Sequence, residues 1–153
     1  MSIDRRALLR GSGVTALGLI GLGHLAGPAA ATGAHTAATD LPGGGPTDGV
    51  TRTLLQHFEA PAKGWDIYQT RVEIPVGKQS GRHLHPTGPE VGYLIRGDVA
   101  MEFDDRPTQI LRTGDPFHIP PDVIHNAVNI GVVTTMMLST YVILHDQPLV
   151  INQ

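Results

Sequence analysis

The chain has 153 residues, a net charge of −3 and no cysteine, and 16% of its residues are charged. This length allows one domain, and the absence of cysteine excludes disulfides, thiolate metal sites and a lipidated N-terminal cysteine. No stretch of lysine or arginine is dense enough to follow a phosphate backbone, which excludes nucleic acid as a partner. The 19 glycines and 12 prolines, beside many Val, Ile and Thr, favour short strands joined by tight turns.

Residues 1–31 have the layout of an export signal. A basic start containing Arg5 and Arg6 precedes a glycine-diluted apolar run, and Ala29 and Ala31 form a small-residue cleavage pattern. The arginine pair resembles the bacterial twin-arginine signal. An uncleaved membrane anchor is the alternative, but the apolar run is shorter than the roughly 20 residues that a span needs. We expect a periplasmic or secreted protein with no stable membrane span after cleavage.

Residues 32–50 are rich in Ala, Thr, Gly and Pro without periodicity, which predicts a flexible linker before a single domain at 51–153. In that domain, β-branched and aromatic segments alternate with Pro and Gly turns. They predict strands at Thr51–Phe58, Ile67–Ile74, Gly81–His85, Glu90–Ile95, Val99–Phe103, Phe117–Ile119, His125–Asn129 and Val132–Leu144. No window has a helical period. The predicted fold class is therefore all-β, a sandwich or a barrel.

The residue types that bind metals cluster from position 83 onward. His83 and His85 are two apart on a predicted strand, so both imidazoles point to one face, about 7 Å apart along the backbone. Residues 86–89, Pro-Thr-Gly-Pro, predict a turn that sets Glu90 across from the pair in a hairpin. Two imidazoles and a carboxylate on one side of a hairpin can share a divalent cation. A further histidine, His125, follows a second proline-rich turn.

These two stretches resemble the two sequence motifs of the cupin superfamily. The first motif is matched by Gly77, His83, His85, Glu90 and Gly97, and the second by Gly114, Pro120, His125 and Asn129. Asp122 stands where the second motif has glycine, and aspartate tolerates a left-handed turn better than most residues. The resemblance covers about residues 51–149 and implies a double-stranded β-helix, that is, a jelly-roll barrel.

The resemblance also implies one divalent transition metal ion inside the barrel, held by His83, His85, Glu90 and His125. Fe, Mn, Ni, Cu and Zn all suit this ligand set, so the identity of the ion stays open. Such a site leaves coordination positions for water, dioxygen or a chelating substrate. Family members commonly form homodimers, and Thr51–Glu59 is a candidate for a strand exchanged between copies.

A few other side chains are candidates for chemistry at this centre. Glu90 could act as an acid/base. His118 could do so only if it faces the cavity, and because it is out of phase with Phe117 and Ile119 we favour a structural or solvent-facing histidine. Tyr68 and Tyr141 lie on strands that could line the cavity. Gly92 either leaves open volume beside the metal or relieves crowding in the barrel.

Two functions follow from these expectations. The first is an exported, metal-dependent cupin enzyme acting on a small chelating organic substrate. Dioxygenase-like oxidation is its commonest analogy, and isomerase, lyase or decarboxylase chemistry occurs on the same scaffold. The alternative is a non-catalytic cupin that binds or senses a small ligand through the metal. An acid/base side chain in the cavity, besides the ligands, would separate the two.

Overall fold

A computed structural model describes residues 49–153 of the chain, so the predicted signal peptide and nearly all of the predicted linker lie outside the described residues. The described part contains ten strands: β1 (Thr51–Glu59), β2 (Trp65–Ile74), β3 (His83–Leu84), β4 (Glu90–Arg96), β5 (Asp98–Phe103), β6 (Gln109–Arg112), β7 (Pro116–Ile119), β8 (His125–Asn129), β9 (Thr135–Leu144) and β10 (Ile151–Asn152). Within residues 49–153 we find no helix with the length and apolarity needed to cross a membrane.

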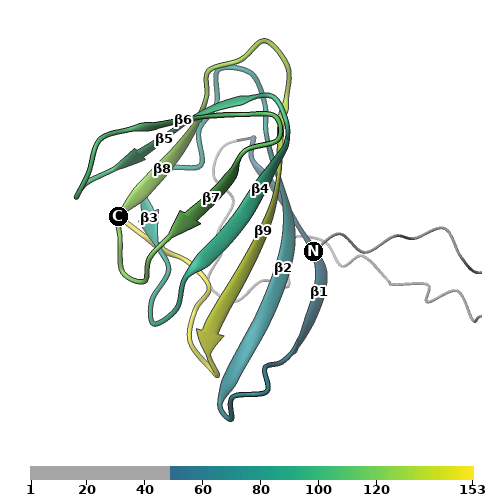
Figure 1. The fold of residues 1–153 in the computed structure, drawn as a ribbon, viewed down its shortest axis with the longest axis vertical. Coiled ribbons are helices and arrows are strands. Elements are labelled where there is room, and N and C mark those ends of the chain that lie inside the picture. The colour runs from purple at the N-terminus through teal and green to yellow at the C-terminus, as the bar shows by residue number, and fades with distance from the viewer. Residues whose placement is uncertain (1–48) are drawn as a thin grey trace, which may run out of the picture. The chain divides into compact units, whose positions relative to one another are not determined.

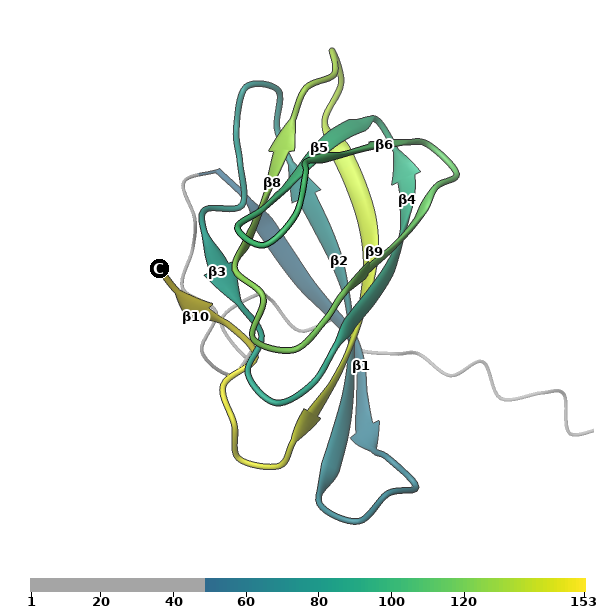
Figure 2. The same cartoon turned by 60° about the vertical axis from the view of Figure 1, so that its left-hand side comes forward.

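The strands form two five-stranded sheets, in the orders β1-β2-β9-β4-β7 and β10-β3-β8-β5-β6. All the pairings between neighbouring strands are antiparallel. After β2, the chain changes sheet at every connection except that from β5 to β6. Figures 1 and 2 show the two sheets facing each other along this path. The predicted all-β, jelly-roll architecture is confirmed.

Alternation along the strands places one set of side chains between the sheets. In β2 every second residue from Asp66 to Ile74 is buried, as expected for a strand with one face on a core. Val72, Leu94 and Met101 belong to one apolar cluster in the barrel interior. Because strand side chains alternate strictly, a polar residue in the inward series is carried into the barrel with its apolar neighbours.

The predicted strand list differs from the structure at its least apolar and shortest elements. β6 and β10 were not predicted, since β6 has four residues with polar ends and β10 has two. The segment 132–134 precedes β9 instead of starting it. Val50, the last residue of the predicted linker, is buried in the core cluster. β1, the candidate for exchange between copies, pairs with β2 of its own chain.

The prediction that Glu90 faces the histidine pair across a hairpin is wrong. β3 pairs with β8 and β10, whereas β4 pairs with β7 and β9 in the other sheet. The turn at 86–89 therefore carries the chain from one sheet to the other. Gly88 lies against β9 in this turn, where a Cβ atom would stand 1.5 Å from the carbonyl oxygen of Val142. This close approach explains why the crossing uses glycine.

Candidate metal centre

Four side chains with metal-ligating groups converge inside the barrel. His83 begins β3, His85 follows that strand, Glu90 begins β4 and His125 begins β8. Their exposed fractions are 5%, 1%, 5% and 2%, respectively. One ring nitrogen of each histidine lies within 4.8 Å of the other two, the only such grouping of His, Cys, Asp or Glu in the described part of the chain. The structure thus brings together all four of the predicted ligands.

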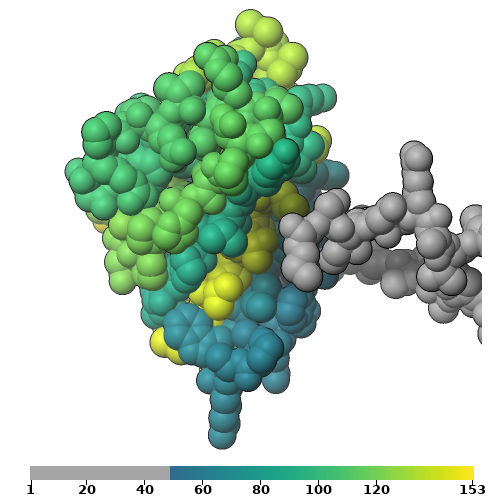
Figure 3. Space-filling view, viewed as in Figure 1, coloured from purple at the N-terminus to yellow at the C-terminus, as the bar shows by residue number. Residues whose placement is uncertain are grey.

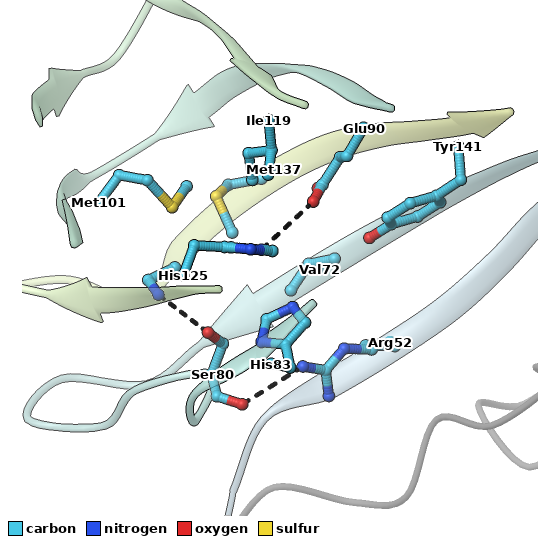
Figure 4. Close-up of a pocket in the computed structure, with 11 residues that line it drawn as sticks. Arg52, Val72, Ser80, His83, Glu90, Met101, Ile119, His125, Met137 and Tyr141 are labelled. Atoms are coloured by element: carbon cyan, nitrogen blue, oxygen red, sulfur yellow. Dashed lines mark hydrogen bonds and ion pairs between the residues drawn. The ribbon is translucent and has the colours of Figure 1, made fainter. Parts of the chain in front are cut away.

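Glu90 reaches this cluster from the opposite sheet. Its Oε2 atom lies 2.8 Å from Nε2 of His85 and 3.7 Å from Nε2 of His125. His83 and His125 are direct register partners of β3 and β8, with ring centroids 4.2 Å apart. Figure 4 shows the carboxylate of Glu90 directed at the ring of His125, with the ring of His83 near by.

Backbone carbonyls fix the orientation of all three imidazoles. The Nδ1 atom of His83 lies 2.8 Å from the Gly81 oxygen, that of His85 2.7 Å from the Leu149 oxygen, and that of His125 3.0 Å from the Val123 oxygen. A carbonyl only accepts hydrogen bonds, so each Nδ1 carries the proton and donates. Each Nε2 atom is then the one that can coordinate an ion. In metal sites, the second ring nitrogen of a ligating histidine usually donates a hydrogen bond in this way.

Burial and mutual charge set the protonation states that a cation requires. Burial, helped by the charges of His125 and His85, lowers the pKa of His83 to about 3. Burial likewise lowers the pKa of His125. Burial by itself would raise the pKa of Glu90, but the hydrogen bond and charge of His85, together with His125, lower it to about 2. Near pH 7 the centre therefore offers two neutral imidazoles and a carboxylate before any ion arrives.

The donor set fits a divalent transition metal. Three imidazole nitrogens and one carboxylate oxygen are borderline ligands that suit Fe, Mn, Ni, Cu or Zn. The centre borders a cavity of about 20 Å³, room for roughly one water molecule. Its lining includes Ala127. Figure 4 labels the other lining residues, which combine apolar Val72, Met101, Ile119 and Met137 with polar Arg52, Ser80 and Tyr141 beside His83, Glu90 and His125.

Of the two tyrosines named from the sequence, Tyr141 reaches this cavity. Its ring centroid lies 4.8 Å from that of His85, and burial raises the pKa of its phenol. Tyr68 instead stacks on His57, with ring centroids 4.1 Å apart, and lines a separate cleft. Tyr141 is therefore a protonated hydroxyl group beside the candidate ligands.

The packing of β7 against β4 decides between the alternatives for His118 and for Gly92. His118 is exposed between buried Phe117 and Ile119, so it points away from the cavity and is not an acid/base candidate there. Gly92 does not provide open volume, because a Cβ atom at this position would lie 2.1 Å from the Phe117 ring and 2.7 Å from the Leu138 oxygen. Phe117 fills that space, which leaves the crowding interpretation of Gly92.

Sequence reasoning missed Arg52 and Leu149. Arg52 is the buried residue of β1. The sequence feature that could have found it is its spacing of two from Leu54, which places both side chains on one face of the strand. Leu149 orients His85 through its backbone oxygen, and a carbonyl contribution of this kind leaves no trace in residue type.

Comparison with known proteins agrees with this fold. A model of the cupin domain matches residues 70–141. The chain is 34% identical over 65 residues to an uncharacterized protein of Methanocaldococcus jannaschii, covering 42% of this chain and 51% of that protein. It is 26% identical over 82 residues to a germin-like protein of Oryza sativa subsp. japonica, covering 49% of this chain and 36% of that protein. The matched region thus spans about half the length of the first relative and about a third of the length of the second.

Solved structures show the same fold at low sequence identity. A double-stranded β-helix protein of Klebsiella pneumoniae has a TM-score of 0.54 at 19% identity, over 67% of this chain and 90% of that one. KdgF of a Halomonas species has a TM-score of 0.54 at 20% identity, over 67% and 86%. An oxalate oxidase has a TM-score of 0.56 at 18% identity, over 76% and 61%. These solved structures share the fold of this chain, and the cupin-domain match falls within the same part of it.

Proposed function

We propose that this protein is a metal-dependent enzyme. One divalent transition metal ion, bound by His83, His85, Glu90 and His125, acts on a small chelating organic molecule. The observation that carries the proposal is the orientation of the three imidazoles. Each Nδ1 atom is hydrogen-bonded to a backbone oxygen, so the three Nε2 atoms face one another beside an ionised carboxylate.

The bound ion would supply Lewis acidity and a coordination position for the substrate. The chain itself supplies groups that donate and accept protons, and apolar side chains that exclude water. The Tyr141 phenol, held protonated by burial, can donate a hydrogen bond or a proton to a substrate oxygen. The ionised Glu90 carboxylate can accept a hydrogen bond or a proton from the substrate. The apolar lining of Met101, Met137 and Ile119 excludes bulk water and strengthens these interactions.

Tyr141 favours catalysis over simple binding, because it is the acid/base group besides the ligands that an enzyme needs. Two fold neighbours support testing oxidation and decarboxylation first, one an oxalate oxidase in complex with glycolate and the other a Lactobacillus farciminis oxalate decarboxylase in a formate complex. The second candidate function is a non-catalytic binding or sensing cupin. The observation that favours it is the cavity volume of about 20 Å³, which leaves little room for a substrate to rearrange.

The experiment is reconstitution of the metal-free protein with Fe, Mn, Ni, Cu or Zn separately. Oxygen uptake and product formation are then followed on a panel of enols, catechols and dicarboxylates. Catalysis predicts turnover with at least one metal, and predicts that Tyr141→Phe keeps the metal and loses most of the rate, roughly 10²–10⁴-fold for a lost general acid. Binding without turnover for every metal would favour the non-catalytic function.

We further propose that the protein is exported by the twin-arginine route and loads its metal beforehand, since that route carries folded proteins. The sequence of residues 1–31 supports this. Replacing Arg5 and Arg6 together with lysine should keep the precursor inside a bacterial host. Export of that variant at the wild-type level would contradict the route.

A further inference from the structure

A second cleft lies at one end of the sheet that contains β1, β2 and β9. It shares no lining residue with the barrel cavity. Its volume is about 410 Å³, within the range of roughly 300–1,000 Å³ that is usual for small-molecule sites. The lining comes from His57 on β1, Asp66 and Tyr68 on β2, and residues 145–148 after β9. Figures 1 and 3 show the β1–β2 hairpin beside the end of β9 in this region.

A buried carboxylate belongs to the lining of this cleft. Asp66 is 3% exposed, because it falls in the buried series of β2. Its Oδ2 atom accepts a hydrogen bond from Nδ1 of His145 at 2.8 Å. Its Oδ1 atom accepts no hydrogen bond from the residues that the structure describes, although Nε2 of His57 lies 3.3 Å away. A buried acceptor without a hydrogen bond calls for a partner that supplies a donor.

Two histidines at the surface cover this carboxylate. The side chains of His57 and His145 are 41% and 55% exposed. Exposed side chains change rotamer rapidly, so a ligand can reach Asp66 while β2 stays in its sheet. His57 also stacks on Tyr68, with ring centroids 4.1 Å apart and the ring planes inclined by 5°. This pair gives the cleft a flat aromatic wall.

The charges around the cleft favour a cation. The hydrogen bond to Asp66 raises the pKa of His145, and the charges of Asp146 and Glu59 raise it further. Burial raises the pKa of the Tyr68 phenol, and the charges of Asp66 and Asp146 act in the same direction. No lysine or arginine is among the described residues of the lining. A protonated His145 offsets one of the two lining carboxylates, so one negative charge remains to attract a cation.

The cleft suits an ammonium group better than a metal ion or a guanidinium. In the described part of the chain, three metal-ligating atoms lie within 4.8 Å of one another at the barrel centre and not here. A guanidinium binds both oxygens of one carboxylate, whereas Oδ2 of Asp66 already accepts from His145. A primary ammonium carries three donors on one atom, and the wall of His57 and Tyr68 can contact its alkyl chain and charge.

We propose that this cleft is a second ligand site, which binds a small primary amine as its ammonium ion through the carboxylate of Asp66. The inference goes beyond the proposed function. It concerns a separate set of residues and holds whether or not the barrel centre carries a metal.

The test is a titration of the full chain with n-butylammonium chloride near pH 7.5, where a primary amine is protonated. Two-dimensional ¹H–¹⁵N NMR spectra should show saturable shifts at residues 57, 66 and 145–147. 1-Butanol, the neutral probe of similar size, should give no saturable shift there. Asp66→Asn keeps the shape and removes the charge, so affinity for n-butylammonium should fall roughly 10- to 150-fold, as for a lost hydrogen bond to a charged group. Asp105→Asn is the matched control, since Asp105 is half-exposed and pairs with Arg106, and it should leave the affinity unchanged.

Three results overturn the proposal. They are no saturable shift at the cleft in the wild type, equal affinities of wild type and Asp66→Asn, and shifts of the same residues by Zn²⁺ alone at lower concentrations than n-butylammonium requires. If Asp66→Asn does not fold, Asp146→Asn decides, because Asp146 is exposed and asparagine tolerates its φ of 62°. Affinity lower by roughly two- to fivefold in that variant supports the ammonium site, and unchanged affinity overturns it. Each of these results leaves the proposed metal-dependent function standing.

Discussion

Nε2 of His85 lies 2.8 Å from Oε2 of Glu90, although β3 and β4 belong to different sheets. The contact spans the barrel interior at the point where the chain crosses between the sheets. Nδ1 of His85 faces the Leu149 oxygen, so Nε2 is the ring nitrogen that meets the carboxylate. A divalent cation bound between Nε2 and Oε2 would be shared by the two groups. The His85–Glu90 pair therefore joins the two sheets and also forms part of the centre where an ion would bind.

The metal-free protein should lose stability in acid. Because the pKa of His83 falls from 6.5 to about 3 on folding, the unfolded chain binds a proton between these values and the folded chain does not. The free energy of unfolding therefore decreases as pH falls from about 6.5 toward 3. Glu90, with its pKa lowered to about 2, adds a loss of the same sign below about pH 4.5.

Urea unfolding of the metal-free protein between pH 4 and pH 7.5 measures this dependence. His83→Gln removes the titrating group, so its profile should be shallower between pH 4.5 and 6.5. His145 has the opposite sign, because its hydrogen bond to Asp66 raises its pKa, and its contribution is lost as pH rises. A wild-type profile that is flat below pH 6.5 would contradict the assignment of neutral, buried His83.

Gly88→Ala should be strongly destabilising. The new Cβ atom would stand 1.5 Å from the Val142 oxygen, so the turn must move away from β9, at a cost of roughly 1–3 kcal/mol or more. Because this turn places Glu90 opposite His85, metal affinity should fall as well. Chemical unfolding and a metal titration measure the two effects. Lys63→Ala, at an exposed position in the turn before β2, should stay within about 0.5 kcal/mol of the wild type. Equal behaviour of both variants would refute the packing argument.

Asp122→Gly should stabilise the protein. Asp122 has a φ of 60°, where most L-residues lose roughly 1–2 kcal/mol, aspartate loses less and glycine loses little. Part of the gain is offset by the entropy of glycine in the unfolded chain, so an increase of less than about 1 kcal/mol is expected. The backbone N–H of this residue still donates to the His85 oxygen. Urea midpoints report the change, and a lower midpoint for Asp122→Gly than for wild type would contradict this explanation.

The sequence predicted the strands that carry a strong alternating or β-branched pattern, and it predicted the four side chains that converge. His83, His85 and Glu90 could be named because their spacing is fixed locally by strand alternation and a proline-rich turn. The sheet to which each strand belongs could not, because pairing of β3 with β8 depends on residues some 40 positions apart. For the same reason the inward position of Arg52 and the Leu149 oxygen on His85 emerged only from the folded chain.

The sequence favoured a structural or solvent-facing His118, because this residue is out of phase with its apolar neighbours Phe117 and Ile119. In β7, Phe117 and Ile119 are the buried pair, and His118 falls on the outer face. Local alternation was therefore enough to place this side chain, whereas the pairing of β7 with β4 became visible only in the folded chain.

The most direct test of the metal centre is elemental analysis of the protein, purified without a chelating resin, beside His85→Ala prepared in the same way. We predict one equivalent of a divalent transition metal per wild-type chain and loss of most of it in His85→Ala, with His118→Ala retaining the wild-type content. A wild-type protein without metal, or a His85→Ala variant that keeps the full equivalent, would contradict the centre formed by His83, His85, Glu90 and His125.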